Sequence, residues 1–374
     1  MPTDPLGGLG PPPEPEGPGP QLQRPQKFIA PPTPSTRALL LLLALFFVAQ
    51  SWLGDWDTAN PVALYRLGAL YWPAVLDGDV WRLGAYAFLH IGPLHFLMNA
   101  WTLWILMRPL EATQGPVTPV GLFAATALMG GLCSAVSGML LGHQYTIAAG
   151  ASAGIFGLFG AQAAIFVRLR KRLPPQLRKA AINALLINIA LNIVVAFSFP
   201  VDNAAHLGGL VSGFLLGLWV PMRGMPERLQ NKVAQWFVIG CAFLLFALEG
   251  AAVARAARPR ARVLRGADYA LTLDWTLVPL GHDHAVSPGD LGLELYVDRV
   301  AHVPQGELAT LGDHAFVRER SHGNRPDGAE VVRTQLTTPW HDGALRLTLE
   351  CSDPSCEKSY DSALDDLAAT LRAR

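Results

Sequence analysis

The amino-acid sequence predicts an all-α polytopic membrane protein that is followed by a small soluble α+β domain. Hydrophobic residues make up 51% of the 374 residues and charged residues only 16%, whereas soluble proteins carry about 25% charged residues. Seven apolar runs approach the roughly 20 residues that a helix needs to cross a bilayer. After about Arg258 apolar and polar residues alternate instead, which is typical of β-strands. The sequence therefore predicts a core of six transmembrane helices, a seventh transmembrane helix and a soluble domain.

The apolar runs divide the chain into four segments. Residues 1–36 are rich in proline and glycine and are expected to form a disordered tail. This tail does not resemble a signal peptide, because the first apolar run begins only at Ala38. The six-span core occupies 37–222, the seventh helix 233–254 and the soluble domain 259–374. The predicted spans are 38–54, 94–110, 118–142, 150–167, 180–199, 204–222 and 233–254.

Basic residues predict the orientation of the spans, because cytoplasmic connections carry an excess of Lys and Arg. With the N-terminus inside, thirteen basic residues flank the inner ends of the spans, whereas the outer connections before the tail hold only Arg66 and Arg82. The five arginines between Arg255 and Arg265 oppose this orientation at the seventh span, but its apolar run of about 22 residues is long enough to cross. We therefore expect a multi-pass protein of the cell membrane with a cytoplasmic N-terminus.

Four polar side chains fall at the same predicted depth. His95 and Asn99 lie near the outer end of the second span, Ser152 opens the fourth span, and His206 opens the sixth. All three spans run from outside to inside, so these side chains should meet near the outer face. His95 and Asn99 are four residues apart and project from one helical face. The sidedness of the spans thus predicts one polar site that opens to the outer face.

Each of these side chains also has an ordinary structural explanation. Ser152 lies in a run of small residues, which form common packing faces between membrane helices. His206 could bond a carbonyl group, and His95 and Asn99 could join helices through hydrogen bonds. However, the glycines that recur every four residues after His206 allow another helix to approach closely. A contact between Ser152 and His206 is then geometrically natural.

Taken together, the three segments resemble the rhomboid family of intramembrane serine proteases. The matching stretches are "HIGPLHFLMN" on the second span, "GASAGIFG" on the fourth and "AHLGGLVSG" on the sixth. The pair Trp81–Arg82 in the first outer connection and Glu111 after the second span also fit. The resemblance covers about 37–222, and the seventh span fits the six-plus-one variant of the family. Ala153 and Phe156 stand where the family often has glycine and tyrosine.

The resemblance implies a serine endopeptidase that hydrolyses peptide bonds in or near the transmembrane helices of membrane proteins. Ser152 would be the nucleophile and His206 the general base, while Asp202 is expected to cap a helix rather than complete a triad. The backbone N–H of Ser152, His95 and Asn99 would stabilise the oxyanion. The implied partners are transmembrane substrates and the lipid bilayer, and no cofactor or metal is expected. Structural roles are expected for Trp81, Arg82, His90, Glu111, Gly150, Phe156, Gly209 and Gly213.

Two other classes of function compete with this interpretation. A catalytically inactive, rhomboid-like protein that binds membrane proteins would not need both Ser152 and His206. A transporter or channel would string ionisable residues across the bilayer or contain inverted repeats, whereas the polar residues here share one depth. A net charge of zero implies no nucleic-acid partner.

The C-terminal segment contains three stretches that alternate like strands. They are "YALTLDWTLVPL", "LGLELYVDRVAHV" and "ALRLTLECSDPSC", and the final "SALDDLAATLRAR" predicts an amphipathic helix. Cys351 and Cys356 could pair in an oxidising compartment. Cys133 and Cys241 lie in apolar runs and are expected to be buried free thiols.

Overall fold

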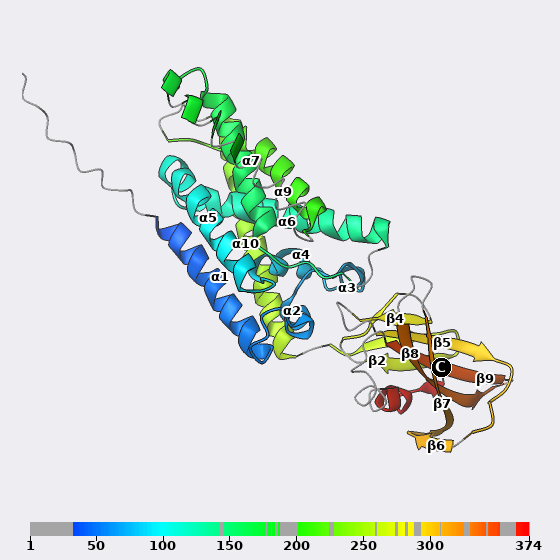
Figure 1. Ribbon diagram of the computed structural model, residues 1–374. Coiled ribbons are helices and arrows are strands. Elements are labelled where there is room, and N and C mark those ends of the chain that lie inside the picture. Colours follow the sequence, from blue (N-terminus) through cyan, green and yellow to red (C-terminus); the bar gives the residue numbers. More distant parts are fainter. Residues whose placement is uncertain are drawn as a thin grey trace, which may run out of the picture. The chain divides into compact units, whose positions relative to one another are not determined.

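The protein consists of a helical part up to residue 258 and a β-stranded part after it (Figure 1). The fold is known from a computed structural model. It describes residues 33–142, 146–176, 178–180, 182–183, 186–187, 201–223, 228–258, 260–273, 276–280, 283–287, 293–306, 308–324, 330–341, 343–351 and 364–373.

Long helices coincide with six of the seven predicted spans. They are α1 (Pro34–Leu53), α5 (Pro93–Gln114), α6 (Val117–Leu141), α7 (Ser152–Leu169), α9 (Asn203–Gly217) and α10 (Leu229–Ala257). Among the described residues, α1, α6, α7 and α10 are long and apolar enough to cross a membrane. Helix α9 has only 15 residues, and α5 carries several polar side chains. The predicted span 180–199 lies largely outside the described residues.

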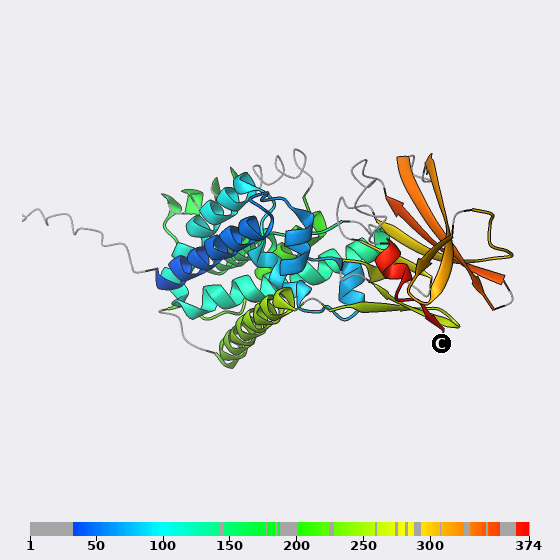
Figure 2. The ribbon, with the colours of Figure 1, turned by 90° about the horizontal axis from the view of Figure 1, so that it is seen from below.

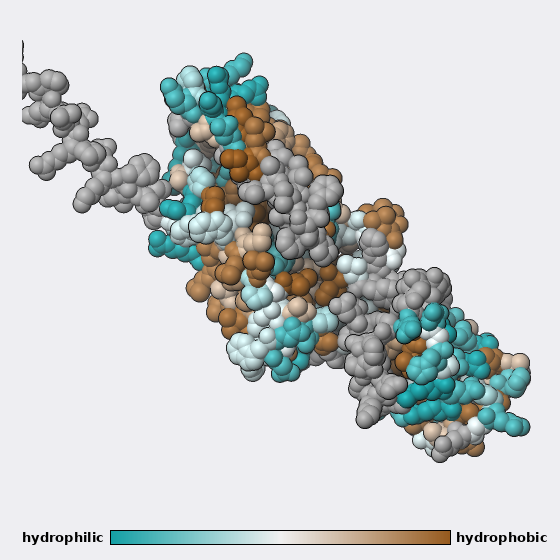
Figure 3. All heavy atoms as spheres, viewed as in Figure 1, coloured by the Kyte–Doolittle hydropathy of each residue, from teal (hydrophilic) through white to brown (hydrophobic). Residues whose placement is uncertain are grey.

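Apolar surface follows the helices. Hydrophobic atoms gather over the helical part on the face shown in Figure 3, whereas hydrophilic atoms cover most of the β-stranded part that is visible there. Many large apolar side chains on the long helices are exposed, including Leu41 and Val48 of α1 and Phe243 of α10. In a soluble protein such exposure would favour aggregation. An apolar helical surface of this extent is typical of a protein that is surrounded by lipid.

The first helix begins at Pro34, slightly before the predicted end of the tail. Proline suits the first turn of a helix, because its missing N–H would have no partner there. The next two N–H groups, of Ser35 and Thr36, donate to the carboxylate of Glu111 on α5 at 3.0 and 3.1 Å. The Thr36 hydroxyl donates to the same carboxylate at 2.6 Å. Glu111 thus caps α1 from a neighbouring helix, which gives a physical basis for its predicted structural role.

The connection between α1 and α5 is folded into short helices, α2 (Pro61–Leu67), α3 (Trp72–Leu76), α4 (Arg82–Ala85) and the 3-10 helix η1 (Tyr86–Phe88). Arg82 holds this connection together from a fully buried position. Its guanidinium group donates to the carbonyls of Tyr65 and Ala69 at 2.8 and 2.9 Å and to the carboxylate of Asp79 at 3.2 Å. A buried arginine is tolerated only when its donors are satisfied in this way.

The described residues of the β-stranded part form two antiparallel sheets (Figure 2). One has the order β1-β2-β10, and the other has the order β3-β4-β5-β9-β8-β7-β6. The strands are β1 (Arg262–Arg265), β2 (Tyr269–Leu273), β3 (Val278–Pro279), β4 (His284–Val286), β5 (Glu294–Val300), β6 (Leu308–Leu311), β7 (His314–Asn324), β8 (Glu330–Trp340), β9 (Gly343–Cys351) and β10 (Arg372–Ala373).

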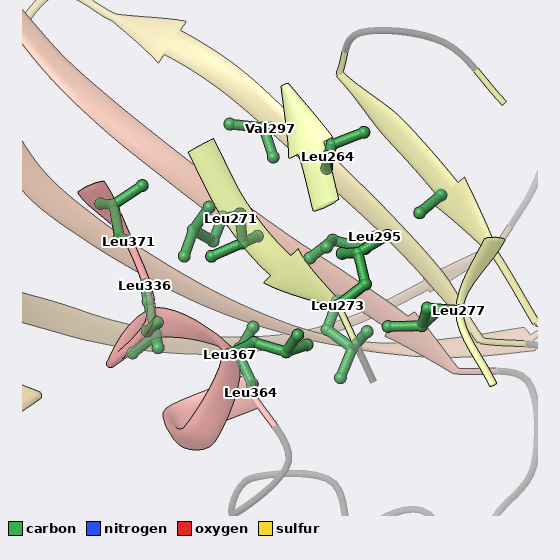
Figure 4. Close-up of a cluster of buried hydrophobic side chains, with 14 of the residues drawn as sticks. Leu264, Leu271, Leu273, Leu277, Leu295, Val297, Leu336, Leu364, Leu367 and Leu371 are labelled. Carbon is green, nitrogen blue, oxygen red and sulfur yellow. The ribbon is translucent and has the colours of Figure 1, made fainter. Parts of the chain in front are cut away.

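A leucine-rich core lies between the sheets and a short helical segment, residues 364–368 (Figure 4). Leu364 and Leu367 from this segment belong to the same buried cluster as Leu271 and Leu347. The prediction of a helix through the final residues is wrong, because Arg372 and Ala373 form β10. Arg372 and Ala373 pair with β2, so backbone pairing with a distant strand overrides the local helical pattern.

The cysteines differ between the two parts of the chain. Cys133 and Cys241 are free, as predicted, but they are half-buried rather than fully buried. Cys351 at the end of β9 is disulfide-bonded. The predicted partner, Cys356, lies outside the described residues.

Candidate active site

Ser152 and His206 meet at the beginning of two adjacent helices. Ser152 is the first residue of α7, and His206 lies in the first turn of α9. The Oγ atom of Ser152 and the Nε2 atom of His206 are 2.8 Å apart, although the residues are 54 positions apart in the sequence. Both side chains are half-buried. A hydroxyl and an imidazole in direct hydrogen-bond contact have the geometry that a nucleophile and its general base require.

Glycines bring the two helices close enough for this contact. A Cβ atom on Gly209 would lie 2.1 Å from the carbonyl oxygen of Ala153, and one on Gly213 would lie 2.0 Å from that of Gly157. Real Cβ atoms never approach oxygen so closely, so α9 packs directly on the α7 backbone through its glycines. The predicted packing face after His206 is confirmed. These glycine contacts fix the distance between α7 and α9 in the turns that follow Ser152 and His206.

The ring of Phe156 stacks on the imidazole of His206. The ring centroids are 4.2 Å apart and the planes differ by 10°. Phe156 is one helical turn after Ser152, so the same helix that carries the hydroxyl also supports the imidazole. The stack limits rotation of the His206 ring and keeps its Nε2 atom directed at Ser152.

His95 lies on the other side of Ser152, across Gly150. A Cβ atom on Gly150 would lie 3.0 Å from His95 Nε2 and 3.6 Å from Ser152 Oγ, so the missing side chain opens space between these two groups. Gly150 also has a φ of +147°, which other residues rarely adopt. Its N–H donates to the carbonyl of Tyr86 at 3.0 Å, which anchors the segment before α7 to η1.

Asn99 lies one turn after His95 on α5 and is buried. Its side-chain Nδ2 atom has no hydrogen-bond partner among the described residues. Because buried polar groups are normally paired, a donor without an acceptor suits a group that arrives only during a reaction. His95 and Asn99 therefore present donors from one helical face.

His90 and Asp202 play supporting parts. His90 is fully buried in the connection before α5, where its ring lies edge-on to that of His95 at 5.3 Å. The carboxylate oxygens of Asp202 are both occupied, since Oδ1 accepts from the N–H of Ala205 at 2.9 Å and Oδ2 accepts from the hydroxyl of Ser134. The prediction that Asp202 caps the helix is confirmed. Its carboxylate bonds do not go to the His206 ring.

Two supporting side chains were not predicted from the sequence. Gln50, near the end of α1, accepts from the N–H of His90 at 2.9 Å and donates to its carbonyl and to that of Thr58. Ser134 on α6 anchors Asp202. Each is a polar residue in an apolar run, which is the only signal in the sequence that could have identified them.

Trp81, Arg82 and Glu111 do not line the Ser152–His206 pair. Arg82 organises the connection between α1 and α5, and Glu111 caps α1. An indirect link to the site exists, because Arg82 holds Ala69 and the next residue, Leu70, forms a two-bond bridge with Ala148. Ala148 lies two residues before Gly150. The hydrogen bonds of Arg82 and Glu111 thus lie around the site rather than at the Ser152–His206 pair.

The part of the chain that carries this site is similar to known proteins. Residues 77–223 match the model described as the Rhomboid domain. Similar proteins include "RHOMBOID-like protein 6, mitochondrial" of Arabidopsis thaliana, which is 35% identical over 168 residues that make up 44% of this chain and 52% of the relative. Rhomboid-like protease 2 of Toxoplasma gondii is 30% identical over 43% of this chain and 55% of its own length. Rhomboid protease GluP of Bacillus subtilis is 26% identical over 58% of this chain and 41% of its own length.

The chain spans about half the length of the curated relatives it matches. The matched range contains Ser152, His206, His95 and Asn99, together with the glycines that pack α9 on α7. The chain is a multi-pass helical membrane protein, and its residues 77–223 are similar to the Rhomboid domain and to proteins named as rhomboid-like or as rhomboid proteases.

Proposed function

We propose that this protein is an intramembrane serine endopeptidase with a Ser152–His206 dyad. The observation that carries the proposal is the 2.8 Å contact between Ser152 Oγ and His206 Nε2 at the ends of two apolar helices. A serine and a histidine that served only for packing would not need a stacked ring to orient the imidazole or an unpartnered donor nearby. Similarity to proteins named as rhomboid proteases supports the same conclusion.

The reaction begins when His206 takes the proton of the Ser152 hydroxyl. The oxygen then attacks the carbonyl carbon of the scissile peptide bond, and the carbonyl oxygen becomes an oxyanion. His206 next gives its proton to the nitrogen of the leaving amine, which leaves an acyl-enzyme on Ser152. Water attacks the acyl-enzyme with His206 again as the base, and the product carboxyl group and the free hydroxyl are released. No carboxylate is required as a third member.

The oxyanion is stabilised by three donors in this proposal. The N–H of Ser152 lies at the N-terminus of α7, where the helix dipole favours negative charge. His95 Nε2 lies across the space at Gly150, and the Nδ2 atom of Asn99 has no other partner among the described residues. Loss of one such donor typically lowers the rate by about 10²–10³.

The substrates proposed for this site are other membrane proteins, and the lipid bilayer is the second partner. A peptide bond inside a regular helix has its carbonyl hydrogen-bonded and shielded, so the substrate helix must unwind locally before attack. We expect small or helix-breaking residues near the cleaved bond. The half-buried position of Ser152 and His206 at their helix ends suits a segment that enters from the membrane surface.

We further propose the full architecture that the sequence predicts. A six-helix core over 37–222 is followed by a seventh helix over 233–254 and a soluble α+β domain over 259–374. The distribution of basic residues favours a cytoplasmic N-terminus in the cell membrane, with the site opening to the outer face. A disulfide at Cys351 suits an oxidising compartment on that side.

Two measurements on the full chain in proteoliposomes test the function. A substrate with one transmembrane helix should be cut within or beside that helix, as located by mass spectrometry of the products. A fluorophosphonate probe should label the wild-type chain on Ser152 and should not label Ser152→Ala. Binding of the substrate with neither cleavage nor labelling would indicate an inactive, membrane-protein-binding relative and would contradict the proposal.

Substitution of Phe156 should reveal the role of the stacked ring. We expect Phe156→Ala to lower kcat/KM by about three- to tenfold, since an aromatic pair contributes about 0.5–1.5 kcal/mol. Phe156→Tyr keeps the ring and should retain a rate close to that of the wild type. Initial rates of substrate cleavage provide the measurement. Equal rates for the alanine and tyrosine variants would show that the stack does not orient His206.

A further inference from the structure

A cavity rich in arginine lies where α10 ends beside the connection between α1 and α5. It is small, with a volume of about 30 Å³, and is open to solvent, and Tyr65 and Trp81 are its aromatic lining residues. Five arginines line it, namely Arg66, Arg82, Arg255, Arg260 and Arg262. So many like charges around one cavity are costly unless anions balance them.

Two of the five charges are balanced inside the protein. The buried guanidinium of Arg262 pairs with Asp77 at 2.5 Å and with Asp79 at 2.6 Å. Asp79 also pairs with Arg82 at 3.2 Å. The nearby carboxylates, phenol and hydrogen bonds keep Arg262 charged, and they raise its pKa despite burial. These ion pairs form one side of the cavity. The carboxylates of Asp77 and Asp79 are both engaged in them and do not pair with the other three arginines.

The remaining three arginines are exposed and have no acidic partner among the described residues. Arg66 donates its Nε proton to the carbonyl of Ala256 at 2.9 Å, which leaves its terminal N–H groups available. The guanidinium of Arg255 lies 5.3 Å from the ring centroid of Trp81. No hydrogen bond joins Arg260 to the described residues. Each guanidinium group has five N–H donors, so the cavity is lined with N–H donors that are available to bind an anion.

The length of α10 puts the cavity at the level where the membrane surface is expected. Helix α10 has 29 residues and is about 44 Å long at 1.5 Å per residue, which exceeds the hydrocarbon thickness of about 30 Å. Arg255 is in its last turn and therefore reaches the headgroup region. Trp52 and Trp56, at the nearby end of α1, are 67% and 71% exposed. Exposed tryptophans are typical of the membrane–water interface.

We propose that this cavity binds the phosphate of an anionic phospholipid headgroup. Guanidinium groups bind phosphate with paired N–H···O bonds, and three unpaired arginines supply both the charge and the donors. A lipid is favoured over free phosphate because the exposed tryptophans and the end of α10 place the cavity beside lipid headgroups. Binding would also balance the charges of Arg255 and Arg260, two of the five arginines at and after the end of this apolar helix. The proposal concerns a site separate from Ser152 and does not rest on catalysis.

The test is a titration of the full chain with lipid in a neutral detergent. Binding is measured as the change in the thermal unfolding temperature. Short-chain phosphatidylglycerol should raise this temperature in a saturable way, whereas phosphatidylcholine, whose choline group would face the arginines, should not. In the triple variant R66Q/R255Q/R260Q the Kd for phosphatidylglycerol should rise about tenfold or more, because several charge-assisted hydrogen bonds are lost. A matched variant, K171Q/R172Q/R178Q, removes three exposed positive charges elsewhere and should keep the wild-type Kd.

Inorganic phosphate forms the third arm of the titration. Saturation by phosphate alone at similar concentration, lost in R66Q/R255Q/R260Q, would keep the phosphate site but overturn a lipid as its source. An unchanged Kd in R66Q/R255Q/R260Q would overturn the site itself. An equal loss in K171Q/R172Q/R178Q would also overturn it, since binding would then follow net charge alone.

Discussion

Alanine at Ser152 should lower the rate of substrate cleavage by a factor on the order of 10⁴ or more, and alanine at His206 should lower it nearly as far. Ser152→Ala removes the atom that attacks. His206→Ala leaves a hydroxyl whose proton has no acceptor, since His206 is the group in contact with Ser152 Oγ at 2.8 Å. Initial rates in proteoliposomes, with protein folding monitored by thermal unfolding, provide the measurement.

The double variant Ser152→Ala/His206→Ala should be no slower than either single variant. Residues that act as one unit are grossly non-additive, because removal of either one already disables the shared step. Ser212→Ala serves as a control, since within the described part of the chain that hydroxyl on α9 donates only to carbonyls of its own helix, at Gly208 and Gly209. A further large loss in the double variant would mean that Ser152 and His206 act separately and would exclude the dyad.

The positions of the polar residues could be predicted from the sequence because a membrane limits how helices can be arranged. Once spans and their directions are assigned, the depth of Ser152, His206 and His95 follows from simple counting. The glycine spacing after His206 then predicts which helices approach each other, and the structure has Gly209 and Gly213 against the α7 backbone. In a membrane protein the direction of each span thus predicts which residues lie at the same depth, whereas in a soluble protein this depends on tertiary contacts.

The supporting contacts could not be predicted in this way. Glu111 reaches the first turn of α1 across about 75 residues of sequence, and Gln50 holds the backbone of His90 across 40. Such bonds depend on rotamers and on helix rotation, which the sequence pattern does not specify. The pattern marks these residues only as polar groups that need partners.

The β-stranded part was predicted less completely than the helical part. Strands were expected in the stretches that contain β2, β3, β5 and most of β9, but β1, β4, β6, β7 and β8 were missed. The sequence of β7, "HAFVRERSHGN", is dominated by polar residues because most of its side chains are exposed. Its place is fixed by pairing with β8 over eight residue pairs rather than by its own pattern. The same kind of pairing draws the chain end into β10.

The second large effect on the cleavage rate is expected from substitution of a glycine that packs α9 on α7. Gly213→Ala should lower the cleavage rate by about 100-fold, because misplacement of reacting groups by about 1 Å has a cost of that size. The new Cβ would lie 2.0 Å from the carbonyl oxygen of Gly157, so α9 must move away from α7. Ser152 and His206 begin these same two helices, and their 2.8 Å contact would open. The thermal unfolding temperature should fall as well.

Gly250→Ala on α10 provides the matched control. Unlike Gly213→Ala, it should not lower the thermal unfolding temperature. A Cβ atom at Gly250 meets nothing within 4 Å, and alanine favours a helix over glycine by about 1 kcal/mol. This variant should therefore keep the wild-type rate and should unfold at the same or a higher temperature. Wild-type activity in Gly213→Ala would show that the site does not depend on close packing of α7 and α9. A Gly250→Ala variant as impaired as Gly213→Ala would attribute the effect to glycine itself rather than to the distance between the helices.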